Sequence, residues 1–486
     1  ESWLPEGLFV SRSSEVLPEY REYERGIATW LNAWVGPLVD GYMRRLQQAL
    51  APAPVSVMQS SGGTVSAGRA GHKAVQLLLS GPAGGLMGAR FIGQQAGASR
   101  LLSFDMGGTS TDVALIEGEI RLTSEGHVGP WPVAVPMVDM HTIGAGGGSI
   151  AALDSGGLLQ VGPESAGATP GPACYGQGGV LPTVTDANLV LGRLQADAFL
   201  GGAMTLDAGA ARQALAGIAT VLAIDIETAA QGIIDIANEH MAQALRVISV
   251  QRGVDPRDHV LVSFGGAGGL HVCALAEALG MHRALVPVHA GVLSALGMLA
   301  APRARQLSHT LTGLLDGFDA DELQQQLQGL ADKGTAALVA EGLAVEDVGA
   351  EFSLDLRYRG QSFSLTLPWQ GLEPTREAFH QVHEQRYGHR LTTAVELVNI
   401  RCKLQGRPPE ISLPALATVD AGPASARSAH LAGYAQPVTV WPRDSLGAGQ
   451  HLAGPALVTE TVATTYLPAG WTCRVDSVGN LMLEGV

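Results

Sequence analysis

The strongest constraint on the fold is a glycine turn between two apolar segments in residues 101–116. Leu101–Phe104 and Val113–Ile116 are runs of strand-forming residues, and the turn between them contains two aspartates, two glycines and three hydroxyl side chains. Glycine has no Cβ, so the backbone N–H groups of such a turn can approach an anion closely. The segment therefore predicts a hairpin whose turn binds a phosphate and its metal ion. A tight hairpin closed by aspartate side-chain hydrogen bonds is the structural alternative.

A second glycine loop follows an apolar strand near residue 260. Val260–Phe264 is the expected strand, Gly265–Gly269 the turn, and Leu270–Leu279 a helix. The N-terminus of a helix offers unpaired N–H groups and the positive end of the helix dipole, which favour an anion. This segment predicts an anion or nucleotide site, and close packing of the strand against the helix is the alternative.

Two helical stripes are expected to form core. Asp207–Leu222 and Thr228–Arg252 are predicted to be long helices. Before them, Asp154–Gly157 predicts a hairpin turn between two short strands. Apolar residues three and four positions apart mark the buried face of a helix. The first such stripe contains Ile27, Trp30, Leu31, Trp34, Leu38, Tyr42 and Leu46. The second contains Ile233, Ile236, Ala237, Met241, Ala244, Leu245 and Ile248.

The length of the chain and a change in its sequence pattern predict more than one domain. Its 486 residues exceed what one core usually organises. After residue 304 the pattern changes to a polar helical stretch at Asp319–Glu341, alternating strand residues at Phe352–Tyr358, and short strands joined by Gly and Pro. We expect an α/β core domain in residues 1–304 and a smaller, β-rich α+β domain in residues 305–486 that begins with the helical stretch.

Charge and cysteine content narrow the functional class. The net charge of -15 argues against a nucleic-acid partner, and no run of about 18 apolar residues offers a membrane span. The four cysteines are far apart and form no CxxC pair, which predicts neither disulfides nor a thiolate zinc site. These features favour a soluble, cytoplasmic protein. Because Glu1 is not an initiator methionine, the chain is also expected to be a fragment or a processed piece.

Several motifs give the chain a family resemblance. In order along the sequence they are Asp105–Asp112, Asp139–Ser149, Gly171–Tyr175, Thr185–Asn188 and Ser263–His271, followed by Arg357–Gln361 and Gly454–Ala456. Together they resemble the hydantoinase A and 5-oxoprolinase family over nearly the whole chain. The resemblance implies the α/β, ribonuclease-H-like fold of the actin, Hsp70 and sugar-kinase ATPases. Its members are ATP-dependent hydantoinases, 5-oxoprolinases, lactamases and ketone carboxylase subunits.

The same resemblance implies a site for ATP and Mg²⁺. Asp105 would hold Mg²⁺ through water, because this cation prefers oxygen ligands, and Asp112 would orient water or the metal. The cofactor-binding residues expected from the two loops are Gly107, Gly108, Thr109, Ser110 and Thr111, and then Gly265, Gly266, Ala267, Gly268 and Gly269. The family usually carries a further N-terminal domain with another Asp-x-Gly-Gly-Thr loop, which this sequence lacks. Either another chain supplies that half of the ATP site, or this chain cannot turn over ATP alone.

A second group of candidate residues consists of Asp139, His141 and His271. Asp139 and His141 are two positions apart on an expected strand and so share a face, while His271 follows a glycine turn. Imidazole and carboxylate groups suit Zn or Mn. Asp139 and His141 are therefore expected to be catalytic, and all three to bind a second divalent metal. Core histidines with hydrogen-bonded rings are the alternative.

Other motifs leave their alternatives open. The glycine segment 144–148 is either a flexible hinge or a cradle for a substrate carbonyl or a phosphate. Cys174, beside Tyr175, is expected to be a small buried thiol in preference to a nucleophile. Asp186 and Asn188 fit helix capping as well as they fit catalysis.

The resemblance finally implies a reaction. ATP would phosphorylate the oxygen of a cyclic amide, which is a hydantoin, 5-oxoproline or a lactam, and water would then open the ring. A hydantoinase B-type partner and a homo- or hetero-oligomer are expected. The alternatives are a subunit of an ATP-dependent ketone carboxylase, another actin-like ATPase or kinase, and a non-catalytic scaffold subunit.

Overall fold

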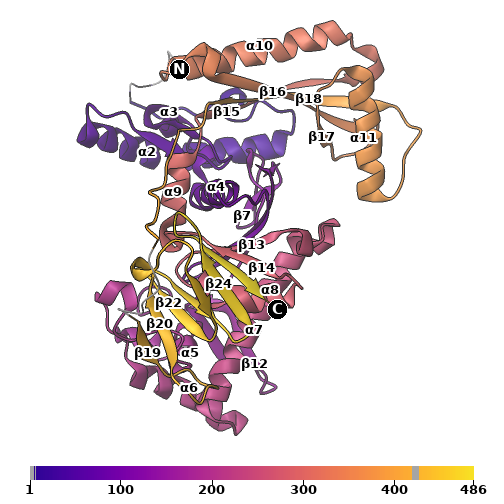
Figure 1. Ribbon diagram of the computed structural model, residues 1–486. Coiled ribbons are helices and arrows are strands. Elements are labelled where there is room, and N and C mark those ends of the chain that lie inside the picture. The colour runs from indigo at the N-terminus through magenta and orange to yellow at the C-terminus, as the bar shows by residue number, and fades with distance from the viewer. Residues whose placement is uncertain (1–4, 6, 419–425, 486) are drawn as a thin grey trace. The chain divides into compact units, whose positions relative to one another are not determined.

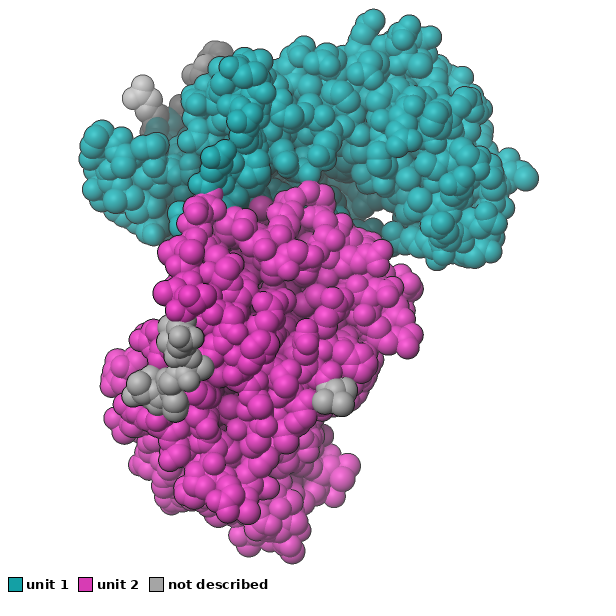
Figure 2. Space-filling view, viewed as in Figure 1, with its two compact units in different colours: residues 1–83, 122–138, 298–410 teal, residues 84–121, 139–297, 411–486 magenta. Residues whose placement is uncertain are grey.

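The computed structural model describes residues 5, 7–418 and 426–485 as a mixed α/β protein (Figure 1). The chain forms two compact units (Figure 2), each built from three separate stretches of sequence. Unit 1 comprises Glu1–Ala83, Leu122–Val138 and Met298–Glu410, and unit 2 comprises Gly84–Arg121, Asp139–Gly297 and Ile411–Val486. Each unit combines residues from both sides of position 305. The division into consecutive domains 1–304 and 305–486 stays a prediction.

Unit 2 is organised around a nine-stranded mixed sheet. The strands in order across it are β10 (His141–Ile143), β4 (Thr111–Glu117), β3 (Arg100–Met106), β13 (Val260–Phe264), β14 (Arg283–Val286), β25 (Leu481–Gly485), β24 (Trp471–Val475) and β21 (His451–Ala453), with β5 (Glu119–Ile120) paired to β4. β3, β13 and β14 run parallel, whereas β4 and the C-terminal strands pair antiparallel. Every residue of β13 is buried, as expected of a parallel strand covered on both faces.

The end of the chain contributes strands to two sheets of unit 2. β24 and β25 extend the nine-stranded sheet, because β25 pairs antiparallel with β14. A separate four-stranded sheet contains β19 (Arg427–Ala429), β20 (Val438–Pro442), β22 (Ala456–Thr459) and β23 (Thr464–Leu467). The short strands predicted near the C-terminus are therefore present. Their pairing with a strand almost two hundred residues earlier could not be read from local sequence.

The two long helices predicted in this part of the chain are present in unit 2, and both begin after aspartate caps. α6 (Ala208–Leu222) starts after Asp207, whose side chain accepts a hydrogen bond from Ala210 N at 2.9 Å, and α7 (Ile226–Ile248) starts after Asp225. The stripe of α7 is half-buried at Ile236 and fully buried at Ile233, Ala237, Met241, Ala244, Leu245 and Ile248, which confirms it as core. No single helix in the described ranges is long and apolar enough to cross a membrane, although α6 and the helix after it, bent by 92°, meet that test as a pair.

The predicted hairpin around Asp154 is also present. β11 (Ser149–Leu153) and β12 (Leu159–Ser165) pair antiparallel. Asp154 Oδ1 accepts hydrogen bonds from Gly156 N at 2.8 Å and from Leu158 N at 2.9 Å. The predicted hairpin is confirmed, and the aspartate closes its turn with its own side chain.

Unit 1 contains a four-stranded antiparallel sheet with two helices against it (Figure 1). The strands in order are β15 (Ala304–Leu314), β18 (Val395–Gly406), β16 (Val348–Tyr358) and β17 (Leu365–Pro368), and the helices are α10 (Ala320–Val339) and α11 (Leu372–Tyr387). Asp319 caps α10 by accepting hydrogen bonds from Asp321 N at 2.9 Å and Glu322 N at 3.1 Å. The polar helical stretch predicted from Asp319 is therefore confirmed.

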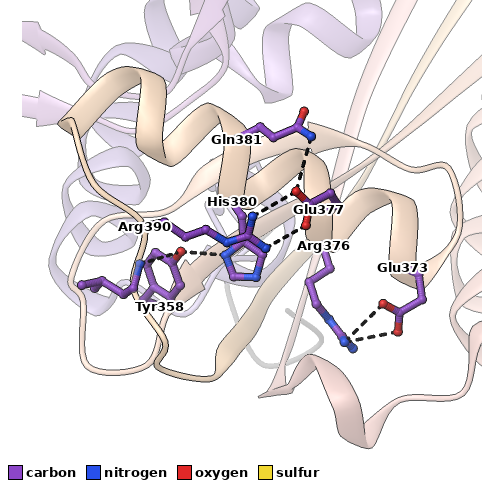
Figure 3. A network of polar contacts seen from close by, with 8 residues as sticks. Tyr358, Glu373, Arg376, Glu377, His380, Gln381 and Arg390 are labelled. Atoms are coloured by element: carbon purple, nitrogen blue, oxygen red, sulfur yellow. Dashed lines mark hydrogen bonds and ion pairs between the residues drawn. The ribbon is translucent and has the colours of Figure 1, made fainter.

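A polar network fixes α11 to the end of β16 (Figure 3). The Tyr358 hydroxyl forms a hydrogen bond with His380 Nδ1 at 2.6 Å. Glu377, one helical turn before His380 on α11, forms an ion pair with Arg390 at 2.8 Å. Tyr358 is the second residue of the motif Arg357–Gln361. Tyr358 therefore joins the sheet of unit 1 to α11, and this position of the family motif has a structural role.

The helix α2 (Glu22–Leu50) packs through a different face from the one predicted. Its buried residues are Ala28, Leu31, Asn32, Gly36, Asp40 and Met43, whereas Trp30, Trp34, Leu38 and Tyr42 of the predicted core stripe are exposed. Asn32 Nδ2 donates to His72 O at 3.0 Å, and Asn32 Oδ1 accepts from Val75 N at 3.1 Å. A Cβ at Gly36 would lie 2.3 Å from the Phe9 ring. Small and polar residues thus form the close contacts of α2, and the predicted core stripe is wrong for those four side chains.

Candidate functional site

The predicted hairpin of residues 101–116 is present and places two carboxylates opposite each other. β3 and β4 pair antiparallel over their full lengths, and Asp105 faces Asp112 in the register. Both strands are buried along most of their length, so the sheet holds the base of the turn rigidly. Asp105 and Asp112 therefore lie side by side at the end of the hairpin, as the motif predicts.

The tip of the turn presents backbone donors. Gly107 N donates to Ser110 O at 3.1 Å and so closes the turn. Gly108 and Thr109 are exposed, and none of the hydrogen bonds within the described part of the chain uses their N–H groups. These two N–H groups are therefore available to an anion, whereas the Gly107 N–H is already engaged.

A glycine segment supports the turn from behind. Gly147 N donates to Gly107 O at 3.0 Å, and Gly148 N donates to Gly108 O at 2.6 Å. A Cβ added at Gly146 would lie 2.7 Å from the carbonyl carbon of Gly108, which is closer than any side chain approaches backbone. The segment thus acts as a backbone support for the turn. Sequence reasoning missed this role, since it weighed only a hinge and a ligand cradle.

The second glycine loop lies against the base of the same turn. Phe264 of β13 faces Asp105 of β3 in the parallel register, and Ala267 N donates to Met106 O at 3.1 Å. Gly265 has a φ of +80°, which a residue with a side chain rarely adopts. A Cβ at Gly265 would also lie 2.3 Å from Asp105 Oδ1. The structure therefore brings both predicted loops together at the Asp105 carboxylate.

Close packing accounts for several glycines of this second loop without a ligand. A Cβ at Gly268 would lie 2.7 Å from Ser263 Oγ, and a Cβ at Gly269 would lie 2.6 Å from Thr464 O. Protein atoms thus occupy the space that the missing side chains leave. The packing alternative explains why these positions are glycine, and their contact with a nucleotide stays a prediction.

The two carboxylates at the base of the turn have raised pKa values. Burial raises the pKa of Asp105 to about 6, and the neighbouring Asp112 carboxylate adds to the rise. Burial also raises the pKa of Asp112, against the hydrogen bond that Thr142 Oγ1 donates to Asp112 Oδ1 at 2.6 Å. Two such carboxylates form an oxygen donor set that suits a hard cation such as Mg²⁺, whose charge favours their ionised forms.

Thr142 is a site residue that sequence reasoning missed. It lies in β10, which pairs antiparallel with β4 and sets Thr142 opposite Asp112. After β4 and the short strand β5, the chain leaves this sheet and returns to it only at His141, so nothing in the local sequence indicates the pairing. Threonine is common in strands, so its presence at position 142 did not indicate a contact with Asp112.

The structure does not gather Asp139, His141 and His271 into a metal site. Asp139 forms an ion pair with Arg252, and His141 is the first residue of β10. His271 is fully buried, its Nδ1 bonds to Asn238 Oδ1 at 2.6 Å, and burial lowers its pKa to about 3. Across residues 5, 7–418 and 426–485, no group of three or more His, Cys, Asp or Glu side chains is arranged to hold a metal ion. A second metal ion and the catalytic roles of Asp139 and His141 stay predictions.

Asp186 caps a helix and also anchors the backbone at Cys174. Thr183 Oγ1 donates to Asp186 Oδ2 at 2.7 Å, and Cys174 N donates to Asp186 Oδ1 at 2.8 Å. Thr183 and Asp186 form a capping box at the start of α5 (Val184–Val190). Cys174 is buried, and burial raises the pKa of its thiol far above the usual range. The prediction of a small buried thiol is confirmed.

The sequence matches known proteins along nearly its whole length. Residues 25–306 match the hydantoinase/oxoprolinase family, and residues 317–485 match the hydantoinase/oxoprolinase C-terminal domain. The chain is 38% identical to caprolactamase subunit alpha of Pseudomonas jessenii over 97% of this chain and 71% of that protein. It is 32% identical to 5-oxoprolinase PfmaA of Pestalotiopsis fici over 94% of this chain but only 37% of that protein.

Two solved structures share the fold. The crystal structure of ATP-dependent caprolactamase from Pseudomonas jessenii matches with a TM-score of 0.87 at 35% identity, over 98% of this chain and 72% of that chain. The nucleotide-free structure of acetone carboxylase matches with a TM-score of 0.79 at 25% identity, over 98% of this chain and 71% of that chain. Both agree with the mixed α/β architecture. As its motifs predict, the chain belongs to the hydantoinase/oxoprolinase family.

Proposed function

We propose that this chain binds ATP and Mg²⁺ as part of an enzyme that hydrolyses a cyclic amide. The observation that carries the proposal is the meeting of two glycine loops at the Asp105 carboxylate, next to a turn with two exposed backbone donors. Family membership supports it, because one relative is named a caprolactamase subunit, another a 5-oxoprolinase, and the solved caprolactamase is described as ATP-dependent. Caprolactam and 5-oxoproline are both cyclic amides.

In this proposal the turn binds phosphate through its exposed tip. Gly108 and Thr109 donate their N–H groups to phosphate oxygens, and Ser110 follows them in the turn. Thr111 Oγ1 donates to Ala145 O at 2.5 Å and so supports the turn, and a role of Thr111 as a ligand stays a prediction. The predicted binding residues of this loop thus divide into donors at the tip and supports behind it.

Asp105 and Asp112 hold the cation in this proposal. The strand register sets the two residues opposite each other, and burial raises the pKa of both carboxyl groups, which supports a cation as their partner. Thr142 keeps Asp112 oriented through its hydroxyl hydrogen bond. Mg²⁺ prefers such oxygen ligands and retains several of its waters, which agrees with a site open at the tip of a turn.

The reaction requires activation because an amide carbonyl is stabilised by resonance. ATP, when bound, supplies a phosphoryl group for the amide oxygen, which creates an electrophile with a phosphate leaving group. The contribution of this chain is to orient the phosphates on fixed backbone donors and to keep the Asp105 and Asp112 carboxylates in place for charge neutralisation. The identity of the ring, whether hydantoin, 5-oxoproline or lactam, depends on a pocket outside this turn.

The same proposal includes the class of ATPase fold in unit 2 and the subunits of the active enzyme. We propose that the sheet of unit 2 is one half of an actin-like, ribonuclease-H-like ATPase. The relative from Pseudomonas jessenii is named subunit alpha, which describes one component of a larger enzyme. A hydantoinase B-type partner within a hetero-oligomer would therefore complete the active enzyme.

Substrate-dependent ATP hydrolysis tests the proposal. The assembled enzyme is assayed for phosphate release with caprolactam, 5-oxoproline or hydantoin, each against a reaction without substrate. We expect at least one cyclic amide to stimulate phosphate release and to be opened to its amino acid or ureido acid. Failure of the chain to bind Mg²⁺–ATP with its partner present would instead support the scaffold alternative.

A ketone carboxylase subunit is the second candidate function. The observation in its favour is the structural match to acetone carboxylase, which is almost as extensive as the match to caprolactamase. The two candidates differ in the co-substrate that they require. Phosphate release that needs both bicarbonate and acetone, and that no cyclic amide stimulates, would favour the carboxylase.

A further inference from the structure

Strand β10 lies at the edge of the nine-stranded sheet and has few contacts of its own. It consists of His141, Thr142 and Ile143, pairs with β4 alone among the described strands, and contains no buried side chain. An edge strand this short and this exposed gains little stability from apolar packing. The hydrogen bond from Thr142 Oγ1 to Asp112 Oδ1 nevertheless depends on where β10 lies. Contacts outside the strand therefore have to hold β10 in place.

The residues after β10 hold its C-terminal end. Thr111 Oγ1 donates to Ala145 O at 2.5 Å, and Gly147 N donates to Gly107 O at 3.0 Å. These contacts tie the segment that follows the strand to the phosphate-binding turn. At the opposite end of β10 the chain enters unit 2 after residues 122–138, which belong to unit 1. That end needs an attachment of its own within unit 2.

Arg252 provides this attachment through Asp139, which lies two residues before β10. The Asp139 carboxylate accepts hydrogen bonds from Arg252 Nη1 at 2.5 Å and from Arg252 Nη2 at 3.3 Å, one on each oxygen. The Asp139 N–H also donates to Arg121 O at 2.8 Å. A planar guanidinium that engages both oxygens of a carboxylate fixes its direction as well as its distance. The pair therefore restrains the chain where it enters β10.

The core of unit 2 in turn holds Arg252. This residue ends the short helix η4 (Val250–Arg252) that follows α7, and its N–H donates to Ser249 O at 2.9 Å. Ser249 is fully buried, and its hydroxyl donates to the carbonyl of Leu245, on the buried stripe of α7, at 2.6 Å. Among the described residues, the Arg252 side chain forms hydrogen bonds with Asp139 alone. It therefore links a core helix to the edge of the sheet.

We propose that Arg252 is a positioning residue for the cation site, because through Asp139 it holds β10 where Thr142 can orient the Asp112 carboxylate. Asp139 is its partner in this role. Arg252 lies 113 positions after Asp139 and belongs to none of the motifs that carry the family resemblance. The consequence for Mg²⁺ binding rests on the proposed function. The attachment itself does not, since it is a property of the metal-free chain.

A second ion pair of unit 2 provides a matched control. Arg246, on α7, pairs with Glu239 at 3.0 Å, and its side chain is 36% exposed, against 35% for Arg252. The Glu239 partner lies on α7 itself and not beside β10. Arg246→Gln therefore removes a similar charge and a similar contact from the same region without affecting the attachment of β10.

Amide hydrogen exchange in the intact chain without Mg²⁺ tests the attachment directly. Arg252→Gln removes the charge and the paired contact, whereas Arg252→Lys keeps the charge but cannot engage both oxygens in one plane. In a peptide that spans residues 139–145, exchange should be at least roughly fivefold faster in Arg252→Gln and intermediate in Arg252→Lys. It should be unchanged in Arg246→Gln. Unchanged exchange in Arg252→Gln would overturn the proposal. If a thermal melt shows that this variant destabilises the whole chain, Arg252→Lys decides by the same criterion.

Mg²⁺ binding then tests whether Arg252 acts through Thr142. Calorimetry of the assembled enzyme gives the Kd for Mg²⁺ in Arg252→Gln, in Thr142→Val and in the variant with both changes. We expect the Kd to rise roughly two- to threefold in the first and about threefold in the second, with no further rise in the combined variant, because both changes remove one interaction. A combined rise near the product, about six- to ninefold, would show that Arg252 acts independently of Thr142 and would overturn the proposal.

The two measurements separate this inference from the proposed function. If the unaltered enzyme does not bind Mg²⁺, the proposed function fails, and the exchange rates of the metal-free chain still support or overturn the attachment of β10 by Arg252. If the unaltered enzyme binds Mg²⁺ but Arg252→Gln binds it equally well, the positioning role fails while the proposed function stands.

Discussion

Replacing Gly146 by alanine is the sharpest test of the phosphate-binding turn. The added Cβ would lie 2.7 Å from the Gly108 carbonyl carbon and from Thr109 N, whereas ordinary contacts begin at 3.4 Å. Both neighbours are backbone atoms of the turn, so they cannot swing away as the end of a side chain can. Relief of the clash therefore requires the turn to move by about 0.7 Å relative to its support.

A movement of that size is large compared with the tolerance of a hydrogen bond. A donor displaced by about 0.7 Å lengthens an N–H···O contact from about 2.9 Å to about 3.6 Å, which is no longer a hydrogen bond. Two such contacts to phosphate would weaken together, so we expect Gly146→Ala to raise the Kd for Mg²⁺–ATP at least roughly tenfold, or about 1.4 kcal/mol. Overpacking should also lower the free energy of unfolding by about 1–3 kcal/mol.

Isothermal titration calorimetry with Mg²⁺–ATP and a thermal melt of the assembled enzyme measure both effects. Gly217→Ala is the matched control, because Gly217 lies inside α6 and a Cβ there meets nothing within 4 Å. This control should bind ATP normally and be slightly more stable, since alanine favours a helix by up to about 1 kcal/mol over glycine. Normal ATP binding by Gly146→Ala would refute the reasoning that the glycine support positions the turn.

Four further predictions concern the carboxylates at the base of the turn. Asp105→Ala should abolish substrate-dependent ATP hydrolysis in the assembled enzyme, and unchanged turnover in that variant would show that Asp105 is not needed for cation binding. Because the pKa of Asp105 is raised to about 6, protons compete with Mg²⁺, and calorimetry should show the affinity for Mg²⁺ rising as the pH increases through about 6. At Asp105 the native metal-free chain holds more protons than the unfolded chain between the ordinary pKa and about 6, so the contribution of Asp105 to stability should fall as the pH rises through that window. A melting temperature with the same pH dependence in Asp105→Asn as in the unaltered chain would contradict the raised pKa. Thr142→Val removes the hydrogen bond to Asp112 and should raise the pKa of Asp112 further and weaken Mg²⁺ binding about threefold, with Thr142→Ser as the variant that restores both.

The parts of the site that follow from local chemistry were predictable from the sequence. The hairpin of β3 and β4 is specified by two apolar runs and the glycines between them, and the antiparallel register then places Asp105 opposite Asp112 without further information. The Asp154 turn and the aspartate caps of α6 and α7 follow equally from side chains acting within a few residues. Such features depend on nothing distant in the chain.

The parts that depend on distant pairing were not predictable. Thr142 contacts Asp112 only because β10 returns to the edge of the sheet beside β4, and the support by Gly147 depends on the same return. The motif identifies Asp139 and His141 as residues of interest. It does not identify their partners, because those depend on how the chain folds in three dimensions. Asp139 consequently pairs with Arg252, which no spacing rule links to it.

The wrong face of α2 has a different cause. Helical periodicity identifies apolar stripes, and α2 has one stripe of large side chains and another of small and polar ones. Size favours the first stripe as core, but Asn32 and Gly36 allow the backbone of α2 to approach its neighbours closely through the second. Periodicity alone does not decide between two such faces.

The support behind the phosphate turn has a consequence for the direction of its donors. The carbonyl of Gly107 and the N–H of Gly108 belong to one planar peptide unit, as do the carbonyl of Gly108 and the N–H of Thr109. Because Gly147 and Gly148 hold the two carbonyls, the two N–H groups on the opposite edges of the same planes must point away from the support. Their aim is therefore set before any anion arrives, and little conformational entropy remains to be lost when one binds. Each engaged carbonyl also polarises its own peptide unit, which makes the outward N–H a stronger donor.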